Sequence, residues 1–459
     1  MVQTITIHLN EIEKTVDNRF SPKYFLITHE LKGLEKHPNI KIKKLGDIVK
    51  YTISGSYIPK YSDKGTPYLR VSDIKTIELD LNPDNLVYIN ENEIKIPDKI
   101  KVKDGDIVIG RTAVLGVSSL INALSLGFII SQHLTRLKPL LPTGYFVAFL
   151  NSSLFKKQME IASYGITRVE LTHAQLKEVK VPILEKRYME EIDKLIQLAD
   201  KKHIEAFKKI NQARQIFEET ININHSNIKE EKTYFISSKD LADIFTPKFY
   251  YPKYLNTLKQ VKKKFKTVKL GDIADIKRGD EVGSENYKKY INKKYSDIPF
   301  VRTSDLINYE IDNYPDYYIE EEIYKELNQD IKEGDILYTK DGKIGLPAMI
   351  TKEDKCIIAS GIARIKVQKE INPNYVFLVL SNEIGLYQAL QRVVIAATLP
   401  HLQSERLAEI EIPLIDSQKQ KEISKLVEEV FILKTEKKKF IKEALELIED
   451  FIENRRNDL

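Results

Sequence analysis

The sequence has few features of a secreted, membrane-bound or disulfide-linked protein. Its single cysteine, Cys356, cannot form an internal disulfide and fits a reducing cytosol. Residues 1–14 contain no basic region followed by an apolar run, so we expect no signal peptide. Nothing approaches about 18 uninterrupted apolar residues, the length of a membrane-spanning helix. We therefore predict a cytoplasmic protein without a membrane partner.

Recognisable catalytic motifs are also lacking. No glycine-rich phosphate loop ends in Gly-Lys-Ser or Gly-Lys-Thr, which argues against ATP hydrolysis by this chain. The eight histidines show no metal-ligand spacing. The strings at Asn82 and Asn372 come nearest to an amino-methyltransferase motif, but both lack its second proline and favour turns instead. We expect no catalytic residue, no metal and no cofactor here, with a duplicated enzyme of unrecognised site as an alternative.

What the chain does contain is an internal repeat. Segments of one half recur in the other in the same order, 225 to 232 positions later. Examples are KLGDI at Lys44–Ile48 and Lys269–Ile273, KDGDIVIG and KEGDILYT beginning at Lys103 and Lys332, and EVKVPIL and EIEIPLI beginning at Glu178 and Glu409. A period this long indicates duplicated domains, because solenoid units span only about 20–50 residues.

Each repeat ends in a long segment with heptad periodicity and no internal glycine or proline. At 1.5 Å per residue, each segment predicts a helix roughly 50 Å long. One apolar stripe per helix needs a partner, and we expect the two helices to pack against each other. The apolar rhythm is broken at His203 and Lys437. The predicted seam positions are Ile192, Ile196, Ile210, Phe217, Leu426, Val430, Leu433, Phe440 and Leu447.

Short β-type runs punctuated by glycine, proline and aspartate precede each helix, which predicts an α/β fold class. We expect two repeated domains related by a pseudo-two-fold axis and separated by two long antiparallel helices. The predicted boundaries are a first domain at 1–184, a first helix at 185–220, a linker at 221–241, a second domain at 242–415 and a second helix at 416–455.

Basic and aromatic residues are interleaved on the predicted loops. The net charge is only +5, although the chain contains 72 lysines and arginines. Cations neutralise phosphates and aromatic rings stack on bases, so this mixture suits nucleic acid, although lysine-rich loops often only contact solvent. Arg70 and Arg302 could instead pair with nearby aspartates. The candidate DNA-binding residues are Tyr57, Arg70, Arg111, Thr112, Lys277, Arg278, Arg302, Lys340, Asp341 and Lys343.

The segments that follow the Gly-Asp-Ile strands differ between the repeats. The first copy has Arg111-Thr112-Ala113-Val114, and the second has Lys340-Asp341-Gly342-Lys343. Asp341-Gly342 predicts a two-residue hairpin turn, because both residues tolerate positive φ. Direct readout requires specific side chains at base edges, so unlike tips predict unlike half-sites if the domains bind DNA.

The two-fold layout, KLGDI, the central Gly-Asp-Ile segment and the Val-Pro-Ile-Leu or Ile-Pro-Leu-Ile entry to each helix resemble the specificity (S) subunit of type I restriction-modification systems. RFSPKYF (Arg19–Phe25) and IFTPKFY (Ile244–Tyr250) resemble the N-terminal motif of a subset of these subunits, which often has an acidic residue where Ser21 and Thr246 stand.

This resemblance implies a non-catalytic subunit that reads double-stranded DNA, with each domain recognising one half of an asymmetric bipartite site. The implied partners are two methyltransferase (M) subunits and, where present, motor-nuclease (R) subunits. S-adenosylmethionine, ATP and Mg would bind those partners. The alternatives are the specificity chain of a type IIB or IIG-like enzyme or of another phage-defence methylation system, and a protein-interaction scaffold.

Overall fold

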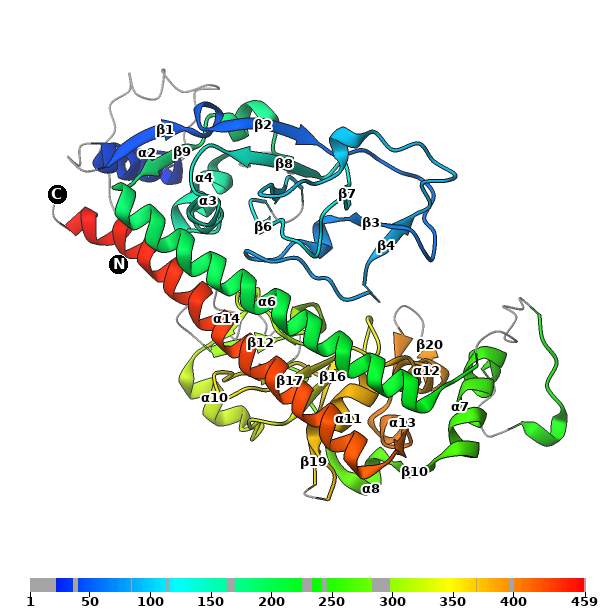
Figure 1. Cartoon of the computed structure of the whole chain (residues 1–459). Helices are drawn as coiled ribbons and strands as arrows, with labels where there is room; N and C mark the ends of the chain where they lie inside the picture. Colours follow the sequence, from blue (N-terminus) through cyan, green and yellow to red (C-terminus); the bar gives the residue numbers. More distant parts are fainter. Residues whose placement is uncertain are drawn as a thin grey trace. The chain divides into compact units, whose positions relative to one another are not determined.

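The computed structural model of the chain, shown in Figure 1, divides into two compact units. One consists of Met1–Ile204 with Glu436–Leu459, and the other of Glu205–Thr435. Each unit therefore contains one mixed domain and parts of both long helices. The residues that the structure describes are 22–35, 40–83, 85–112, 115–162, 170–224, 233–241, 246–282, 298–368, 370–395 and 400–457. The motif residues 19–21 and 244–245 and the tip residues Ala113 and Val114 lie outside these ranges.

The first domain is built from short strands. Its antiparallel four-stranded sheet has the order β2 (Val49–Ser54), β8 (Leu134–Pro139), β5 (Ile107–Gly110) and β6 (Ser118–Leu120). A mixed three-stranded sheet has the order β4 (Val87–Ile89), β3 (Thr66–Leu69) and β7 (Ile129–Ile130). The strands β1 (Lys41–Lys44) and β9 (Lys180–Ile183) form an antiparallel pair.

The second domain repeats this topology strand for strand. Its four-stranded sheet has the order β11 (Ala274–Arg278), β19 (Ile362–Val367), β16 (Ile336–Thr339) and β17 (Pro347–Met349). The three-stranded sheet is β15 (Tyr318–Ile319), β12 (Ile298–Val301) and β18 (Ile357–Ile358), and β10 (Lys266–Lys269) pairs with β22 (Glu411–Leu414). Two further hairpins are β13 (Leu306–Ile307) with β14 (Glu310–Ile311), and β20 (Val394–Ile395) with β21 (Pro400–His401).

Short helices complete each domain. The first has α2 (Pro22–Glu35), α3 (Thr143–Leu150), α4 (Ser153–Ala162) and α5 (His173–Lys177). The second has α7 (Pro252–Lys264), α8 (Leu270–Ile273), α10 (Glu321–Leu327), α11 (Pro373–Leu380), α12 (Glu383–Gln391) and α13 (Ser404–Ala408). The helices α3 and α11 are apolar on nearly every side and lie buried in the cores.

Equivalent tyrosines fasten these core helices to the strands that lead into the long helices. Tyr145 of α3 donates a hydrogen bond to the carbonyl of Pro182, and Tyr375 of α11 donates one to that of Pro413, each at 2.5 Å. The prolines stand in β9 and β22, so the residues before them are extended, as the sequence predicts. A buried phenol needs such a partner, so the bond also fixes the core helix.

Two long helices follow these strands, α6 (Lys186–Ile221) and α14 (Ser417–Asn457). In the first unit the rings of Tyr188 and Phe451 pack in a tilted arrangement with 4.3 Å between their centroids, and Lys202 lies 2.6 Å from Glu436. As α6 ascends, its partner positions on α14 descend, so the helices run antiparallel. The mixed α/β fold class with two repeated domains and two long antiparallel helices is confirmed. The five domain boundaries stay predictions.

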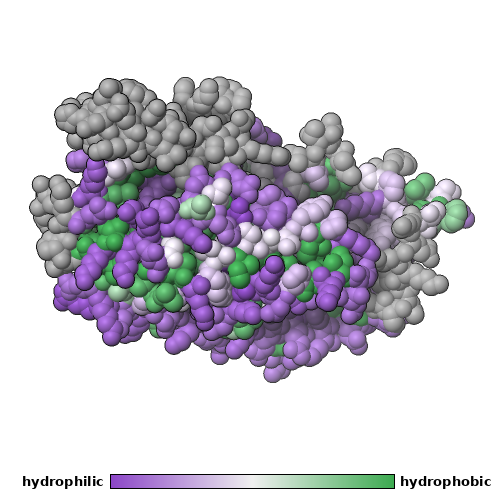
Figure 2. Space-filling model, turned by 90° about the horizontal axis from the view of Figure 1, so that it is seen from above, coloured by the Kyte–Doolittle hydropathy of each residue, from purple (hydrophilic) through white to green (hydrophobic). Residues whose placement is uncertain are grey.

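The structure buries more of the long helices than one apolar stripe. Of the predicted seam residues, Leu426, Phe440 and Leu447 are half-buried, and the other six are buried: Ile192, Ile196, Ile210, Phe217, Val430 and Leu433. Val427, Ile441 and Ile448 are buried beside the half-buried positions. These long helices pack against the domains as well as each other, which widens the buried face. Hydrophilic residues dominate the face shown in Figure 2, with smaller hydrophobic patches among them.

Candidate nucleic-acid interface

The tip after β5 in the first domain is held by a side-chain network around Arg111. The guanidinium of Arg111 donates to the carbonyl of Leu171 at 2.7 Å and to the hydroxyl of Ser54 at 2.5 Å. Its other terminal nitrogen lies 2.8 Å from a carboxylate oxygen of Glu170. An isolated antiparallel bridge joins Thr112 to Glu170. The candidates Arg111 and Thr112 therefore share one surface with Glu170, whose side chain is more than half exposed.

His173 lies beneath this tip at the start of α5. Its Nε2 lies 2.7 Å from the hydroxyl of Ser54 and 3.2 Å from that of Thr135, and its Nδ1 lies 3.4 Å from the hydroxyl of Thr52. Burial lowers the pKa of His173 below its ordinary value, and the charges of Arg111 and Lys177 lower it further. The imidazole is thus kept neutral near pH 7, where it can accept one hydrogen bond and donate another within the network.

The tip after β16 in the second domain has the same backbone frame and different side chains. Lys340 accepts a backbone hydrogen bond from Leu402 at 2.8 Å, and its side chain is almost completely buried. Asp341 forms an antiparallel bridge with His401 and a hydrogen bond to the His401 ring. The neighbouring Lys343 is exposed. Only part of the predicted hairpin-tip triplet is therefore accessible to a ligand in this conformation.

The predicted two-residue turn at Asp341-Gly342 is wrong in its length. Gly342 has the expected positive φ of 69°, but the β16–β17 hairpin closes only at Thr339, which accepts from Gly345 at 3.0 Å. The amide of Gly342 donates instead to Pro400 in β21 at 3.0 Å. The loop is longer because its backbone bonds are made to another segment of the chain.

Two residues beside the tips were missed by sequence reasoning. Glu170 and His401 occupy equivalent repeat positions, 231 apart, and each bridges the residue after its domain's basic position. The first domain combines a basic tip residue with an acidic bridging residue, whereas the second combines Asp341 with a histidine. The signal available in the sequence was the alignment of the two repeats, which places these unlike residues opposite each other.

The paired arginines are engaged in the interactions that were the alternative to DNA binding. Arg70 lies 3.3 Å from Asp73 and donates to the carbonyl of Asn85 at 2.6 Å. Arg302 lies 2.6 Å from Asp316 and 3.8 Å from Asp305. Both arginine side chains are partly exposed, but Asp73 is buried whereas Asp316 is exposed, so a phosphate could replace the carboxylate partner of Arg302.

Asp305 shows how deeply this arginine site is built into the domain. Its carboxylate accepts from the backbone amide of Arg302 at 2.7 Å, and the residue is only 3% exposed. Burial raises the pKa of Asp305 to about 6, against the lowering effects of that hydrogen bond and of the Arg302 charge. The carboxyl group therefore gains its proton at a much higher pH than an exposed aspartate does.

The remaining candidates are exposed. Lys277 and Arg278 stand at the end of β11, with Lys277 3.7 Å from Asp275. Tyr57 exposes 67% of its surface, next to the glycine and serine that follow β2. An exposed ring and exposed cations suit contacts with bases and phosphates. All three remain predicted DNA-binding residues.

Within the described ranges, no group of three or more histidine, cysteine, aspartate or glutamate residues could hold a metal ion. The same described residues include no helix long and apolar enough to cross a membrane. The side chains around the tips offer hydrogen-bonding groups and charges that could read a polar, anionic ligand.

Comparison with known proteins identifies the family. A family model described as "Type I restriction modification DNA specificity domain" matches twice, at residues 38–224 and 262–447. Among curated proteins, none matches the chain.

Similar solved structures include the type I restriction-modification system S subunit from M. genitalium, 15% identical over 92% of this chain and 98% of that chain, with a TM-score of 0.34. Another is the HsdS subunit from Thermoanaerobacter tengcongensis, 14% identical over 92% and 98%, with a TM-score of 0.30. The assignment rests on the family model, which covers most of both repeats. The chain belongs to the type I restriction modification DNA specificity domain family and is a DNA sequence-specificity subunit that is not itself catalytic.

Proposed function

We propose that the two domains read two different halves of an asymmetric bipartite DNA site. The observation that carries this proposal is the difference in chemistry between equivalent tips. Arg111 and Glu170 meet in the first domain, and Asp341 and His401 meet in the second. Donor and acceptor patterns differ among base pairs in the major groove, so unlike side chains select unlike bases.

Partner proteins would carry out the methylation and cleavage reactions. Two methyltransferase subunits would dock on the chain and carry S-adenosylmethionine, and motor-nuclease subunits, where present, would use ATP and Mg. The complex would act in the cytoplasm on chromosomal and incoming DNA. The long helices support this arrangement, because α6 and α14 continue through both units and can hold two readers on one scaffold.

The decisive experiment is methylome sequencing of a host that produces this chain together with a methyltransferase subunit. We expect one motif made of two unlike halves separated by a fixed number of unspecified base pairs. DNA binding by the purified complex should weaken steeply with salt, because phosphate contacts release counterions. A motif with identical halves would overturn the asymmetry, and methylation that does not depend on this chain would overturn the role itself.

A further inference from the structure

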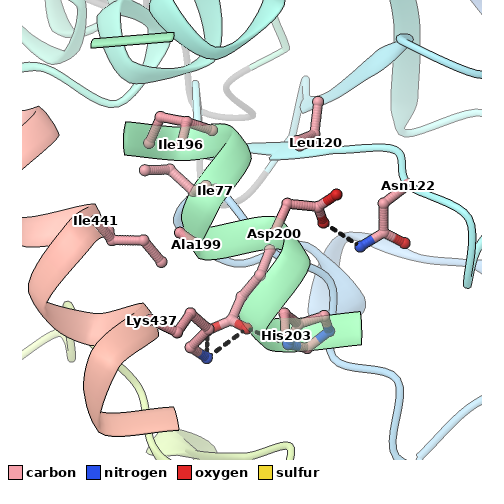
Figure 3. A pocket seen from close by; sticks show the side chains of 10 residues that line it. Ile77, Leu120, Asn122, Ile196, Ala199, Asp200, His203, Lys437 and Ile441 are labelled. Carbon is pink, nitrogen blue, oxygen red and sulfur yellow. Dashed lines mark hydrogen bonds and ion pairs between the residues drawn. The ribbon is translucent and has the colours of Figure 1, made fainter. Parts of the chain in front are cut away.

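A buried ion pair joins the first domain to the second long helix. The Lys437 ammonium donates to both carboxylate oxygens of Glu78, at 2.9 and 2.8 Å. The Lys437 side chain is 1% exposed and the Glu78 side chain 9%. His203 of α6 completes the group, with a ring nitrogen 3.4 Å from Glu78. Figure 3 shows Lys437 and His203 converging from α14 and α6.

The surroundings of this group exclude a ligand site. The adjoining cavity holds ≈ 20 Å³, about enough for one water molecule. Ile77, Ile196 and Ile441 line much of it, and Asp200 is already bonded to Asn122 at 2.7 Å. The buried charges are therefore better explained by a role within the protein than by binding of a small molecule.

The second unit contains another buried ion pair, which is formed by the acid equivalent to Glu78 and a different position of α14. Glu310 stands 232 positions after Glu78, and its carboxylate lies 2.7 Å from the ammonium of Lys434 on α14. Lys434 also donates to the carbonyl of Asn308 at 2.7 Å. Within this pair the lysine side chain is 5% exposed and the glutamate 0%. In the alignment of the two repeats, His203 of α6 corresponds to Lys434 of α14. Each acid therefore lies beside the same aligned position of a long helix.

An unusual backbone presents both acids to the helices. The residue before Glu78 is Ile77, with φ of 73°, and the residue before Glu310 is Tyr309, with φ of 69°. Positive φ is rare for a bulky residue and exceptional for a β-branched one. Such strain persists only where the surroundings impose it, and it marks positions with a task. Its recurrence at equivalent positions in both domains indicates that Glu78 and Glu310 have the same role.

Buried charges can supply a specificity that apolar seams lack. Leucine and isoleucine contacts can be remade after a helix slides by one turn or one heptad, whereas a buried charge must keep its partner. Polar residues at seam positions are known to fix register. Lys434 and Lys437 stand one helical turn apart on α14, and each holds a different domain.

We propose that Glu78–Lys437 and Glu310–Lys434 are positioning pairs that fix where each domain sits on the long helices, and thereby set the number of base pairs between the two half-sites. This rests on the proposed bipartite reading. The half-site bases would still be chosen at the tips, so spacing and base preference should respond to different substitutions.

The test uses the full chain with its methyltransferase subunit and a library of sites whose spacers vary by up to about three base pairs. The variants are Glu310→Gln and the double substitution Glu310→Met with Lys434→Met. The double variant removes the charges while retaining bulk, which generally preserves folding of a buried site. We expect the wild-type complex to methylate one spacer length, and both variants to methylate neighbouring lengths to within about tenfold of it, with unchanged half-site bases.

The matched control is Glu429→Gln. It removes a partly exposed pair of 2.7 Å between Lys209 of α6 and Glu429 of α14, which joins the two long helices. Native spacing in the control and relaxed spacing in the positioning variants supports the proposal. Unchanged spacing in the folded double variant overturns it, as does equal relaxation in the control. A wild-type complex that methylates no two-part site would overturn the proposed function as well, which separates the two failures.

Discussion

Lys437→Met should destabilise the first unit far more than an ordinary lysine substitution. The methionine matches the lysine stem in length but leaves the Glu78 carboxylate buried without the ammonium that now contacts both its oxygens. Removing one member of a buried ion pair typically costs about 3–5 kcal/mol. For a unit of roughly 200 residues, 1 kcal/mol shifts the midpoint by about 2–4 °C, so the melting temperature should fall by roughly 6–20 °C.

Thermal and urea unfolding followed by circular dichroism would measure this change. Lys209→Met is the matched control, because its pair with Glu429 has side chains 27% and 35% exposed and should be worth about 0–1 kcal/mol. Adding Glu78→Met to Lys437→Met should recover much of the loss, since the unpaired buried charge is gone. If Lys437→Met costs no more than Lys209→Met, the reasoning about this ion pair is refuted.

Three further predictions concern pH, base choice and the seam. Asp305→Asn should flatten the pH dependence of stability. Because the pKa of Asp305 is raised to about 6, the wild-type free energy of unfolding should fall as pH rises from about 4 to 6, by up to roughly 3 kcal/mol from this group. Denaturant titrations at several pH values would measure this, and an equal change in the free energy of unfolding with pH in both proteins would contradict it. Glu170→Gln should change only the half-site read by the first domain and His401→Gln only the other; methylome motifs decide, and one substitution altering both halves would refute the separation of the domains. Ile196→Asp places a carboxylate at a fully buried seam position, which should lower the free energy of unfolding by several kcal/mol and prevent assembly with the methyltransferase. Size-exclusion chromatography would show the loss of assembly. The control Lys194→Asp changes an exposed residue and should leave assembly intact.

The repeat and the long helices could be predicted because their signals are local or periodic. Ordered matches such as KLGDI survive small insertions, and an uninterrupted heptad pattern has few structural solutions. The pairing of Arg70 with Asp73 could likewise be anticipated as an alternative, because the partners are three residues apart. Residues that act with near neighbours in the chain are thus visible in the sequence.

The less predictable features depend on distant parts of the chain. His203 and Lys437 stood out only as breaks in the apolar rhythm, because their partner Glu78 lies 359 residues from Lys437. The tip at Asp341 departs from a tight hairpin because β21 supplies its backbone partners. Burial of Val427 beside Leu426 similarly reflects packing against the second domain, which a two-helix seam cannot anticipate.

The distance between Glu78 and Lys437 has a consequence for synthesis of the chain. At about 5–20 residues per second, a ribosome needs roughly 20–70 s to make the 359 residues between them. Throughout that interval the N-terminal domain has its strained acidic turn but not the lysine that neutralises it. The domain can reach its final stability only after Lys437 has been added to the chain, so a chain that terminates before this residue carries an uncompensated carboxylate and is open to proteolysis.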